Sequence, residues 1–461
     1  MPYRRMLMLV LCALVYGWAG CSYDMTIPNV PMQSYQPAPI PQLLDQVAAR
    51  SGPDQTLTAG VRVVDITPYD RKAWIAGFGP GRKSHGVLDP VTARILFLDD
   101  GRQAVVLIAL DLVGLMNPDV NKLRALITSK YPHQVLVMCT HNHQGPDPIG
   151  YWGPGLLIPV DRGVDDDWMA KTMQDIALGV DRAIETAAPA RLAFAETTVE
   201  PGWSTNLWFP EGAGPKDDRM AVIRVEKTDG TALATVINWA CHAESLLDRN
   251  NKISADFPGF FYQACEKRGG GTGIFLNGAL GGMVTEVPNR WELRKNYRSL
   301  AKRLEWTGQM GDRLAELALA TVKDAPRLDR PRIALRRAEV EIPMQNSFFK
   351  IAADNGILRV GDRVVRERTF RSEVYALDLG PATAAFVPGE PFPSLGFLLK
   401  AAMPWAKPPM VVGLANDELS YMMMPEQWND KHYGYERSMS CGRETGRLVY
   451  EALRALLQQG H

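Results

Sequence analysis

From residue 58 onward, short apolar runs of strand length alternate with longer segments of helical periodicity. Residues 104–110 form a continuous apolar run that ends at an aspartate, as expected for a strand buried on both faces. Residues 165–187 repeat apolar side chains at the spacing of an amphipathic helix. We find no internal repeat and no second linker here. The alternation predicts an α/β fold, with residues 58–461 forming a single large domain whose mixed β-sheet core is flanked by helices.

The boundaries of the expected elements follow from turn residues and changes of periodicity. Further strands are expected at residues 60–67, 92–98, 134–138, 221–225, 232–239, 274–276, 333–342 and 374–386. Further helices are expected at residues 118–131, 255–267, 393–402 and 444–458, with one or two within 291–323.

The first twenty residues are typical of an export signal. Two arginines precede an apolar run at residues 6–20, which is shorter than the roughly 20 residues of a transmembrane helix. Residues 19–21, Ala-Gly-Cys, are similar to the cleavage box of bacterial lipoproteins, although Trp18 stands where an aliphatic residue is usual. The resemblance implies a signal peptide at 1–20 and lipidation of Cys21. Ordinary secretion and an uncleaved anchor are the alternatives.

Residues 21–57 contain six prolines among polar residues, five of them between residues 28 and 41, a composition typical of an extended tether. With Cys21 lipidated, this tether would hold the domain at a membrane of the bacterial cell envelope. Ser22 favours the outer membrane if the cell is Gram-negative.

The charge and cysteine content exclude two classes of protein. Lys and Arg number 51 and Asp and Glu number 51, so the chain lacks the cationic excess of a nucleic-acid-binding protein. Six cysteines in 461 residues are too few for a disulfide scaffold. An enzyme or a binding protein remains.

Three of the seven histidines follow predicted strands. His141 and His143 follow the strand at 134–138, and residues two apart in an extended segment point to the same side. His242 follows the strand at 232–239. Each histidine alone is as well explained by a polar loop or a structural hydrogen bond. Together they predict an active site at the strand ends, with imidazoles that suit zinc, copper, nickel or iron.

The domain resembles the neutral/alkaline non-lysosomal ceramidase family. The matching motifs occur in the family's order over some 400 residues: Val64-Asp-Ile-Thr-Pro68, Gly86-Val-Leu-Asp-Pro-Val-Thr-Ala-Arg94, Thr140-His-Asn-His-Gln-Gly-Pro146, Asn238-Trp-Ala-Cys-His242, Ile253-Ser-Ala-Asp-Phe-Pro-Gly259, Asn277-Gly-Ala-Leu-Gly281, Pro388-Gly-Glu390 and Leu414-Ala-Asn-Asp417 with Tyr421. The chain looks like a shorter bacterial branch without the family's C-terminal immunoglobulin-like domain.

The resemblance implies a zinc amidohydrolase that cleaves the N-acyl bond of ceramide or a related lipid amide. It implies four zinc ligands, His141, His242, Glu390 and Tyr421. His143 and Tyr435 match residues that act on the substrate. Zinc at such a site lowers the pKa of water to about 7 and polarises a carbonyl.

Three departures from the family bear on the substrate. Leu207 stands where the family has an arginine thought to assist the reacting carbonyl, and Glu418 replaces the first of two tyrosines. Residues 279–282 lack a carboxylate of the corresponding turn. The alternatives are therefore a hydrolase of another amide or ester on the same scaffold, or a non-enzymatic envelope lipoprotein that binds a lipid or glycan.

Two further groups of residues flank these motifs. Cys139 and Cys241, beside the histidines, are expected to be core thiols, with a disulfide or metal ligation as alternatives. Trp203, Trp208, Phe209 and Met422–Met424 either line an apolar channel for a lipid or pack in the core, and core packing is the simpler expectation.

Overall fold

The computed structural model describes residues 56–459, except 129–133, 156–158, 201, 210–213, 286–298 and the side chain of Arg363. These residues all belong to one compact unit, Ile40–His461. The predicted signal peptide, the lipidation candidate Cys21 and the tether up to residue 55 lie outside the described residues.

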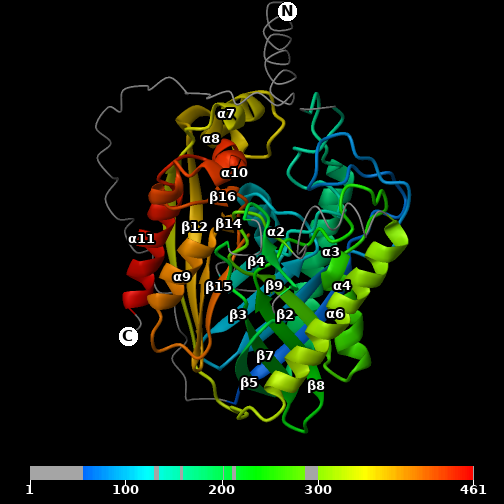
Figure 1. The fold of residues 1–461 in the computed structure, drawn as a ribbon. Helices are drawn as coiled ribbons and strands as arrows, with labels where there is room; N and C mark the ends of the chain where they lie inside the picture. The colour runs from blue at the N-terminus through cyan, green and yellow to red at the C-terminus, as the bar shows by residue number, and fades with distance from the viewer. Residues whose placement is uncertain are drawn as a thin grey trace, which may run out of the picture. The chain divides into compact units, whose positions relative to one another are not determined.

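An eight-stranded mixed sheet carries most of the fold (Figure 1). Its order is β4-β3-β2-β1-β5-β7-β8-β9, and the strands are β1 (Thr58–Asp65), β2 (Thr92–Asp99), β3 (Ala104–Leu110), β4 (Val135–Cys139), β5 (Ala188–Thr198), β7 (Arg219–Lys227), β8 (Ala232–Trp239) and β9 (Thr272–Asn277). Only two residue pairs join β1 to β5. The two four-stranded halves therefore turn toward each other at this junction, and the edge strands β4 and β9 come into contact.

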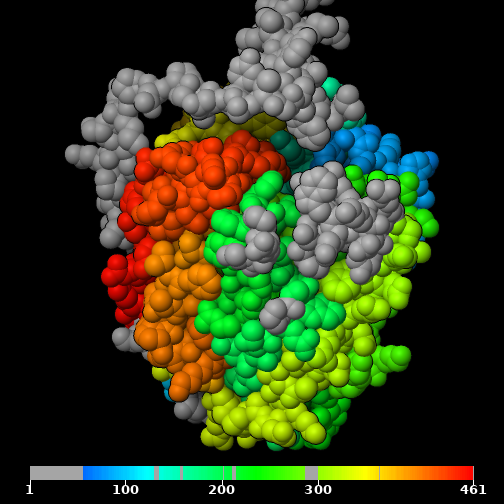
Figure 2. All heavy atoms as spheres, in the orientation of Figure 1, coloured from blue at the N-terminus to red at the C-terminus, as the bar shows by residue number. Residues whose placement is uncertain are grey.

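A second, four-stranded sheet packs beside the first. It runs β11 (Ile333–Pro343), β12 (Thr369–Leu379), β13 (Ala382–Phe386) and β15 (Pro409–Val412). Apolar side chains of this sheet and of both halves of the large sheet form one buried core, in which Leu107, Ile223 and Leu377 represent the three parts. In the space-filling view the C-terminal segments, orange to red, lie against the green central part of the chain (Figure 2).

Helices cover the outer faces of the sheets. The helices are α2 (Asn117–Leu126), α3 (Asp166–Glu185), α4 (Asp256–Lys267), α6 (Leu300–Val322), α7 (Ser347–Asp354), α8 (Gly361–Glu367), α9 (Pro393–Ala401), α10 (Gly434–Met439) and α11 (Thr445–Gln458). α3 packs on the β1–β4 half, α4 and α6 on the β5–β9 half, and α9 and α11 on the second sheet. None of the helices in the described ranges is long and apolar enough to cross a bilayer.

The apolar run at β3 is buried on both faces because its alternate side chains enter different cores. Val106 and Ile108 pack toward α3, whereas Val105 and Leu107 face the second sheet. The local signals also agree with the helix ends: Asp165 caps α3 by accepting a hydrogen bond from the backbone N–H of Trp168 at 2.9 Å.

The predicted α/β class with a mixed sheet flanked by helices is confirmed. Most predicted strands and helices are present, but the structure adds β5 and the separate second sheet. The strand expected at 374–386 is a hairpin of β12 and β13, because the chain turns at Gly380, whose φ is 56°. Part of the helix expected within 291–323 lies outside the described residues, and α6 begins at Leu300.

Candidate metal centre and active site

The loops that follow β4 and β8 meet at one place. A parallel bridge joins Asn142 to Ala243, and the backbone N–H of His143 donates to the carbonyl of Ala243 at 2.9 Å. His141, His143 and His242 are thereby brought together from segments a hundred residues apart. All three are at least 93% buried, and one ligand atom from each lies within 4.8 Å of the others.

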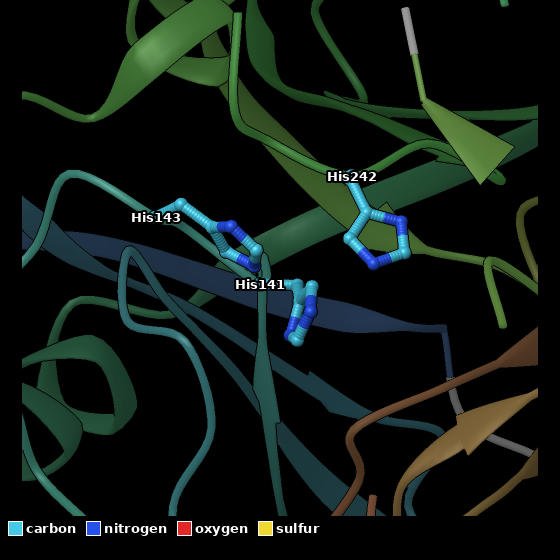
Figure 3. A group of neighbouring side chains, drawn as sticks. All are labelled: His141, His143 and His242. Atoms are coloured by element: carbon cyan, nitrogen blue, oxygen red, sulfur yellow. The ribbon is translucent and has the colours of Figure 1, made fainter. Parts of the chain in front are cut away.

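The rings of the three histidines face a common space (Figure 3). The centroid of the His141 ring is 4.7 Å from that of His143 and 4.7 Å from that of His242. The Nδ1 atoms of His141 and His242 each lie 2.8 Å from a backbone carbonyl, that of Val113 and that of Val284 respectively. A neutral imidazole carries one N–H, so donation from Nδ1 leaves the Nε2 lone pair available to a metal.

Glu390 completes this arrangement. Its Oε2 atom lies 3.5 Å from Nε2 of His141 and 3.4 Å from Nε2 of His242. Oε2 of Glu390 and Nε2 of His242 are fully buried and have no hydrogen-bond partner. Buried polar atoms are rarely left without a partner, so this convergence fits a cation bound between the two imidazoles and the carboxylate.

Tyr421 is held beside Glu390 by a short parallel ribbon. β14 (Glu390–Pro391) pairs with β16 (Tyr421–Met422), and Glu390 and Tyr421 are direct partners in its register. The hydroxyl of Tyr421 donates to Sδ of Met283 at 3.3 Å. Gly281 packs against this ribbon, and a Cβ there would lie 2.6 Å from the carbonyl oxygen of Glu390. A glycine is therefore needed at this turn, because the ribbon approaches its backbone closely.

Burial governs the protonation of these groups. Desolvation, followed by repulsion from the other imidazoles, holds the pKa of His141 well below its ordinary value, and burial also lowers the pKa values of His143 and His242. The imidazoles are therefore neutral, which is the form that binds metals. Burial and the charges of Glu436 and Glu244 raise the pKa of Glu390. A cation would reverse that effect.

His143 is oriented by groups that the sequence analysis did not identify. Its Nδ1 lies 3.2 Å from Oε2 of Glu244, and Phe78 packs edge-on against its ring at 5.3 Å. Arg82 donates from Nη2 to the His143 carbonyl at 3.1 Å. Gly77 permits this packing, because a Cβ there would come within 2.3 Å of Cγ of His143. In the sequence, the position of Glu244 two residues after His242 could have indicated that it lies at the site.

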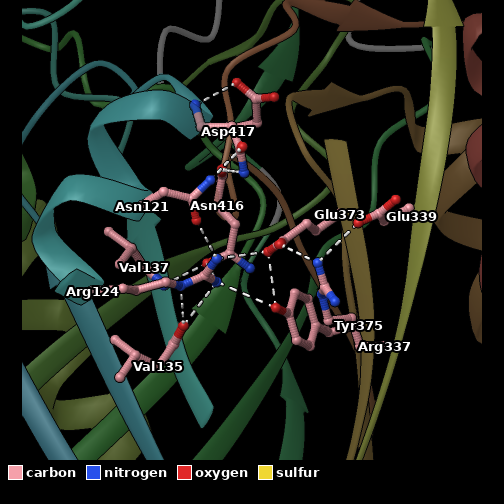
Figure 4. A network of polar contacts seen from close by, with 11 residues as sticks. Asn121, Arg124, Val135, Val137, Arg337, Glu339, Glu373, Tyr375, Asn416 and Asp417 are labelled. Carbon is pink, nitrogen blue, oxygen red and sulfur yellow. Dashed lines mark hydrogen bonds and ion pairs between the residues drawn. The ribbon is translucent and has the colours of Figure 1, made fainter. Parts of the chain in front are cut away.

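A polar network beside β4 fixes the segment that leads to Tyr421 (Figure 4). Oδ1 of Asn416 accepts hydrogen bonds from the backbone N–H of Val137 at 2.9 Å and from Nη2 of Arg124 at 3.1 Å. Arg124 in turn pairs with Glu373 at 2.7 Å. Asn416 has a φ of 62°, so its backbone is in the left-handed region that asparagine tolerates.

Tyr435 lies on the outer side of Tyr421. Their ring centroids are 5.9 Å apart, and Tyr435 is 49% exposed whereas Tyr421 is 5% exposed. The structure thus brings together His141, His143, His242, Glu390 and Tyr421, with Tyr435 at the rim.

The substituted positions lie near the same centre. The backbone N–H of Leu207 donates to the carbonyl of Met283 at 3.0 Å. The next residue, Trp208, donates from Nε1 to Oε1 of Glu436. Trp208 also packs, with Phe209, on a cluster that contains Tyr421.

The four cysteines in the described ranges are buried and form no disulfide, so Cys139 and Cys241 are core thiols as expected. Met422 and Met423 pack in cores, and Trp203 stacks on Trp306 at 5.0 Å.

Comparison with known proteins agrees with this geometry. No protein-family model matches the chain. Neutral ceramidase of Mycobacterium tuberculosis (strain ATCC 25618 / H37Rv) is 25% identical over 239 residues, which cover 47% of this chain and 36% of that protein. The match thus spans about a third of the relative's length. The crystal structure of neutral ceramidase from Pseudomonas aeruginosa superposes with a TM-score of 0.69, covering 88% of this chain and 74% of that chain at 17% identity.

The fold is that of the neutral ceramidases. A ceramidase complexed with C2 superposes similarly, with a TM-score of 0.67 over 88% of this chain and 75% of that chain at 16% identity. The resemblance drawn from the motifs is therefore confirmed in sequence and in fold. In this fold the three buried histidines form a group that can hold a metal ion.

Proposed function

We propose that this protein is a zinc-dependent hydrolase that cleaves the N-acyl amide bond of ceramide or a related lipid amide. One observation carries the proposal: Nε2 of His141 and Nε2 of His242 approach the same oxygen of Glu390, at 3.5 Å and 3.4 Å, with both Nδ1 atoms bound to backbone carbonyls. The similarity to proteins named neutral ceramidase supports the choice of an amide.

His141, His242, Glu390 and Tyr421 would hold the metal. Two imidazoles and one carboxylate are a usual ligand set for catalytic zinc. Bound there, zinc would supply a Lewis acid that polarises the acyl carbonyl and lowers the pKa of water to about 7.

The remaining residues of the site would act on the substrate. His143, which is held by Arg82, Phe78 and Glu244, would hydrogen-bond the reacting carbonyl or the amide nitrogen. Desolvation of its hydroxyl and the nearby carboxylates of Glu390 and Glu436 raise the pKa of Tyr435 above its ordinary range, so its phenol keeps its proton and can donate a hydrogen bond. The aromatic cluster around Tyr421 would provide an apolar wall for an acyl chain.

A hydrolase of another amide or an ester is the second candidate. Leu207 favours it, because the arginine thought to assist the carbonyl in the family is absent. We also propose that the protein is exported and attached to the cell envelope by lipid on Cys21, as the motif at residues 19–21 indicates.

Metal content measured together with hydrolysis of a panel of N-acyl substrates tests these proposals. We expect zinc in the purified protein and release of fatty acid from N-acyl sphingoid bases. Turnover of another amide or ester alone would select the second candidate. Protein that neither contains zinc nor hydrolyses any member of the panel after zinc is added would contradict an enzymatic role.

A further inference from the structure

The side chain of Asn277, the last residue of β9, is fully buried and makes four hydrogen bonds to backbone groups. Its Nδ2 donates to the carbonyl of Thr140 at 2.9 Å and to that of Cys241 at 2.7 Å. Its Oδ1 accepts from the backbone N–H of Cys241 at 3.1 Å and from that of Gly278 at 3.0 Å. Both N–H bonds of the amide and two acceptor positions of its oxygen are therefore in use.

The two carbonyls that accept from Asn277 belong to the peptide bonds that enter two of the proposed metal ligands. The carbonyl of Thr140 lies in the peptide that leads into His141, and that of Cys241 in the peptide that leads into His242. A peptide group is planar, so a bond to its oxygen restrains the orientation of the whole plane. At His141 this plane is followed by a φ of 61°, a conformation that persists only where the surroundings enforce it.

One amide thus links the two ends of the large sheet. Asn277 is paired with Trp239 in the parallel ladder of β8 and β9, so its bonds to Cys241 lie within one half of the sheet. Thr140 follows β4 and belongs to the other half. β4 and β9 are the two edge strands in the order of the sheet, and they contact each other (Figure 1). The bond from Asn277 to Thr140 therefore connects the loop of His141 to the half that carries His242.

A second link lies on the other side of the two histidines. Asn142 and Ala243, the residues directly after His141 and His242, form a parallel bridge. Each histidine is therefore restrained both before and after its own position. The Nε2 atoms that result lie 3.5 Å and 3.4 Å from the same oxygen of Glu390. Bonds from zinc to imidazole nitrogen are only about 2.0–2.1 Å long, so a small shift of either loop would spoil a shared site.

We propose that Asn277 is a positioning residue that sets the spacing of the imidazoles of His141 and His242 and thereby the affinity of the site for zinc. This inference rests on the metal centre of the proposed function. Asn277 acts through the peptide groups that enter the two histidines rather than as a ligand, because its amide is already bonded to four backbone groups. Removing a group that orients metal ligands typically lowers metal affinity by about 10–100-fold.

The test is Asn277→Leu, which keeps a side chain of similar size, introduces no charge and removes all four hydrogen bonds. Zinc affinity is measured on the purified protein by competition with a chelator of known affinity. We expect the Kd for zinc to rise by about 10–100-fold. The visible absorption bands of the cobalt(II)-substituted protein depend on the arrangement of the ligands, and they should change as well. Neither measurement requires hydrolysis of a substrate.

Asn346→Leu is the matched control. The side chain of Asn346 has the same bonding pattern, with Nδ2 donating to two carbonyls and Oδ1 accepting from two backbone N–H groups. These groups are the carbonyls of Ser438 at 2.7 Å and Ser440 at 2.9 Å and the N–H groups of Phe348 at 2.8 Å and Phe349 at 3.3 Å. Asn346 joins the start of α7 to the end of α10, away from the loops of His141 and His242. Both variants should lower the urea midpoint, but only Asn277→Leu should weaken zinc binding.

Wild-type zinc affinity in Asn277→Leu, or an equal loss of affinity in the control, would overturn the positioning role. If Asn277→Leu does not fold, Asn277→Ser provides a smaller polar side chain, and it should also raise the Kd for zinc. Wild-type protein that binds no zinc would refute the proposed metal centre, and the role of Asn277 with it. Wild-type protein that binds zinc but hydrolyses no amide or ester would refute the proposed function and not the role of Asn277.

Discussion

Replacing Arg124 by methionine should lower the free energy of unfolding by more than the loss of an exposed ion pair would. The Arg124 side chain is 5% exposed. It donates to the carbonyl of Val135 from Nε at 3.1 Å and from Nη2 at 2.9 Å, pairs with Glu373 at 2.7 Å, and donates to Asn416 at 3.1 Å (Figure 4). Methionine keeps most of the apolar stem, so the substitution removes mainly the charge and these hydrogen bonds.

The loss of stability depends on the groups that lose a partner when the guanidinium is removed. Removing one partner of a buried ion pair costs about 3–5 kcal/mol. Arg337 continues to pair with Glu373 at 2.6 Å, which reduces the cost of the remaining charge. The carbonyl of Val135 loses both guanidinium donors, a loss of about 1–3 kcal/mol. We therefore expect the free energy of unfolding to fall by about 3 kcal/mol, near the lower end of the range for broken buried pairs.

Urea unfolding monitored by fluorescence measures this difference. The control is Arg371→Met, because Arg371 pairs with Glu341 at 3.0 Å while the two side chains are 40% and 46% exposed. Exposed pairs contribute about 0–1 kcal/mol. Equal losses of stability in Arg124→Met and in the control would refute a large contribution from the buried network. Zinc affinity should also fall in Arg124→Met, since Asn416 begins the segment that leads to Tyr421.

Three further outcomes are expected. His141→Asn should reduce zinc content from stoichiometric to trace and abolish hydrolysis. The unfolding midpoint should be retained, because asparagine tolerates the left-handed φ of 61° at this position. Normal zinc content would contradict the ligand assignment. Burial raises the pKa of Asp417 to about 7, so the folded state keeps a proton that the unfolded state releases near pH 4. The free energy of unfolding of the wild type should therefore fall by about 2–3 kcal/mol between pH 5 and pH 8 through this group. Asp417→Asn should remove that fall in urea titrations, and pH curves that stay parallel for the two proteins would contradict it. Cys21→Ser should abolish palmitate labelling and release the protein from the membrane fraction, and continued labelling would exclude Cys21 as the acceptor.

The histidines could be located from sequence because each follows an apolar strand of clear pattern. Strands buried on both faces are visible as continuous apolar runs, and the polar residues after them must lie at an edge of the sheet. The sequence could not show how the edges meet. The large sheet bends at the two residue pairs between β1 and β5, and this bend brings the loops after β4 and β8 together.

Glu390 and Tyr421 could be assigned only by resemblance to a family. Their segments form strands of two residues each, which are too short to show periodicity, and their pairing depends on packing against Gly281. The bond between Trp208 and Glu436 joins residues 228 positions apart and has no local signal. Such contacts arise from the tertiary arrangement, so the residues that refine the site were the least predictable ones.

Strained backbone and buried hydrogen bonds hold the geometry of the centre. His141, Met283, Asn416 and Ser420 all have φ between 56° and 62°, a conformation that costs energy in most residues and persists where the surroundings enforce it. Here the surroundings are buried hydrogen bonds, from His141 to Val113 and from Val137 to Asn416. These contacts make the Nε2 atoms of His141 and His242 converge on one oxygen of Glu390, and the strain concentrated in these loops serves to aim the three groups at that point.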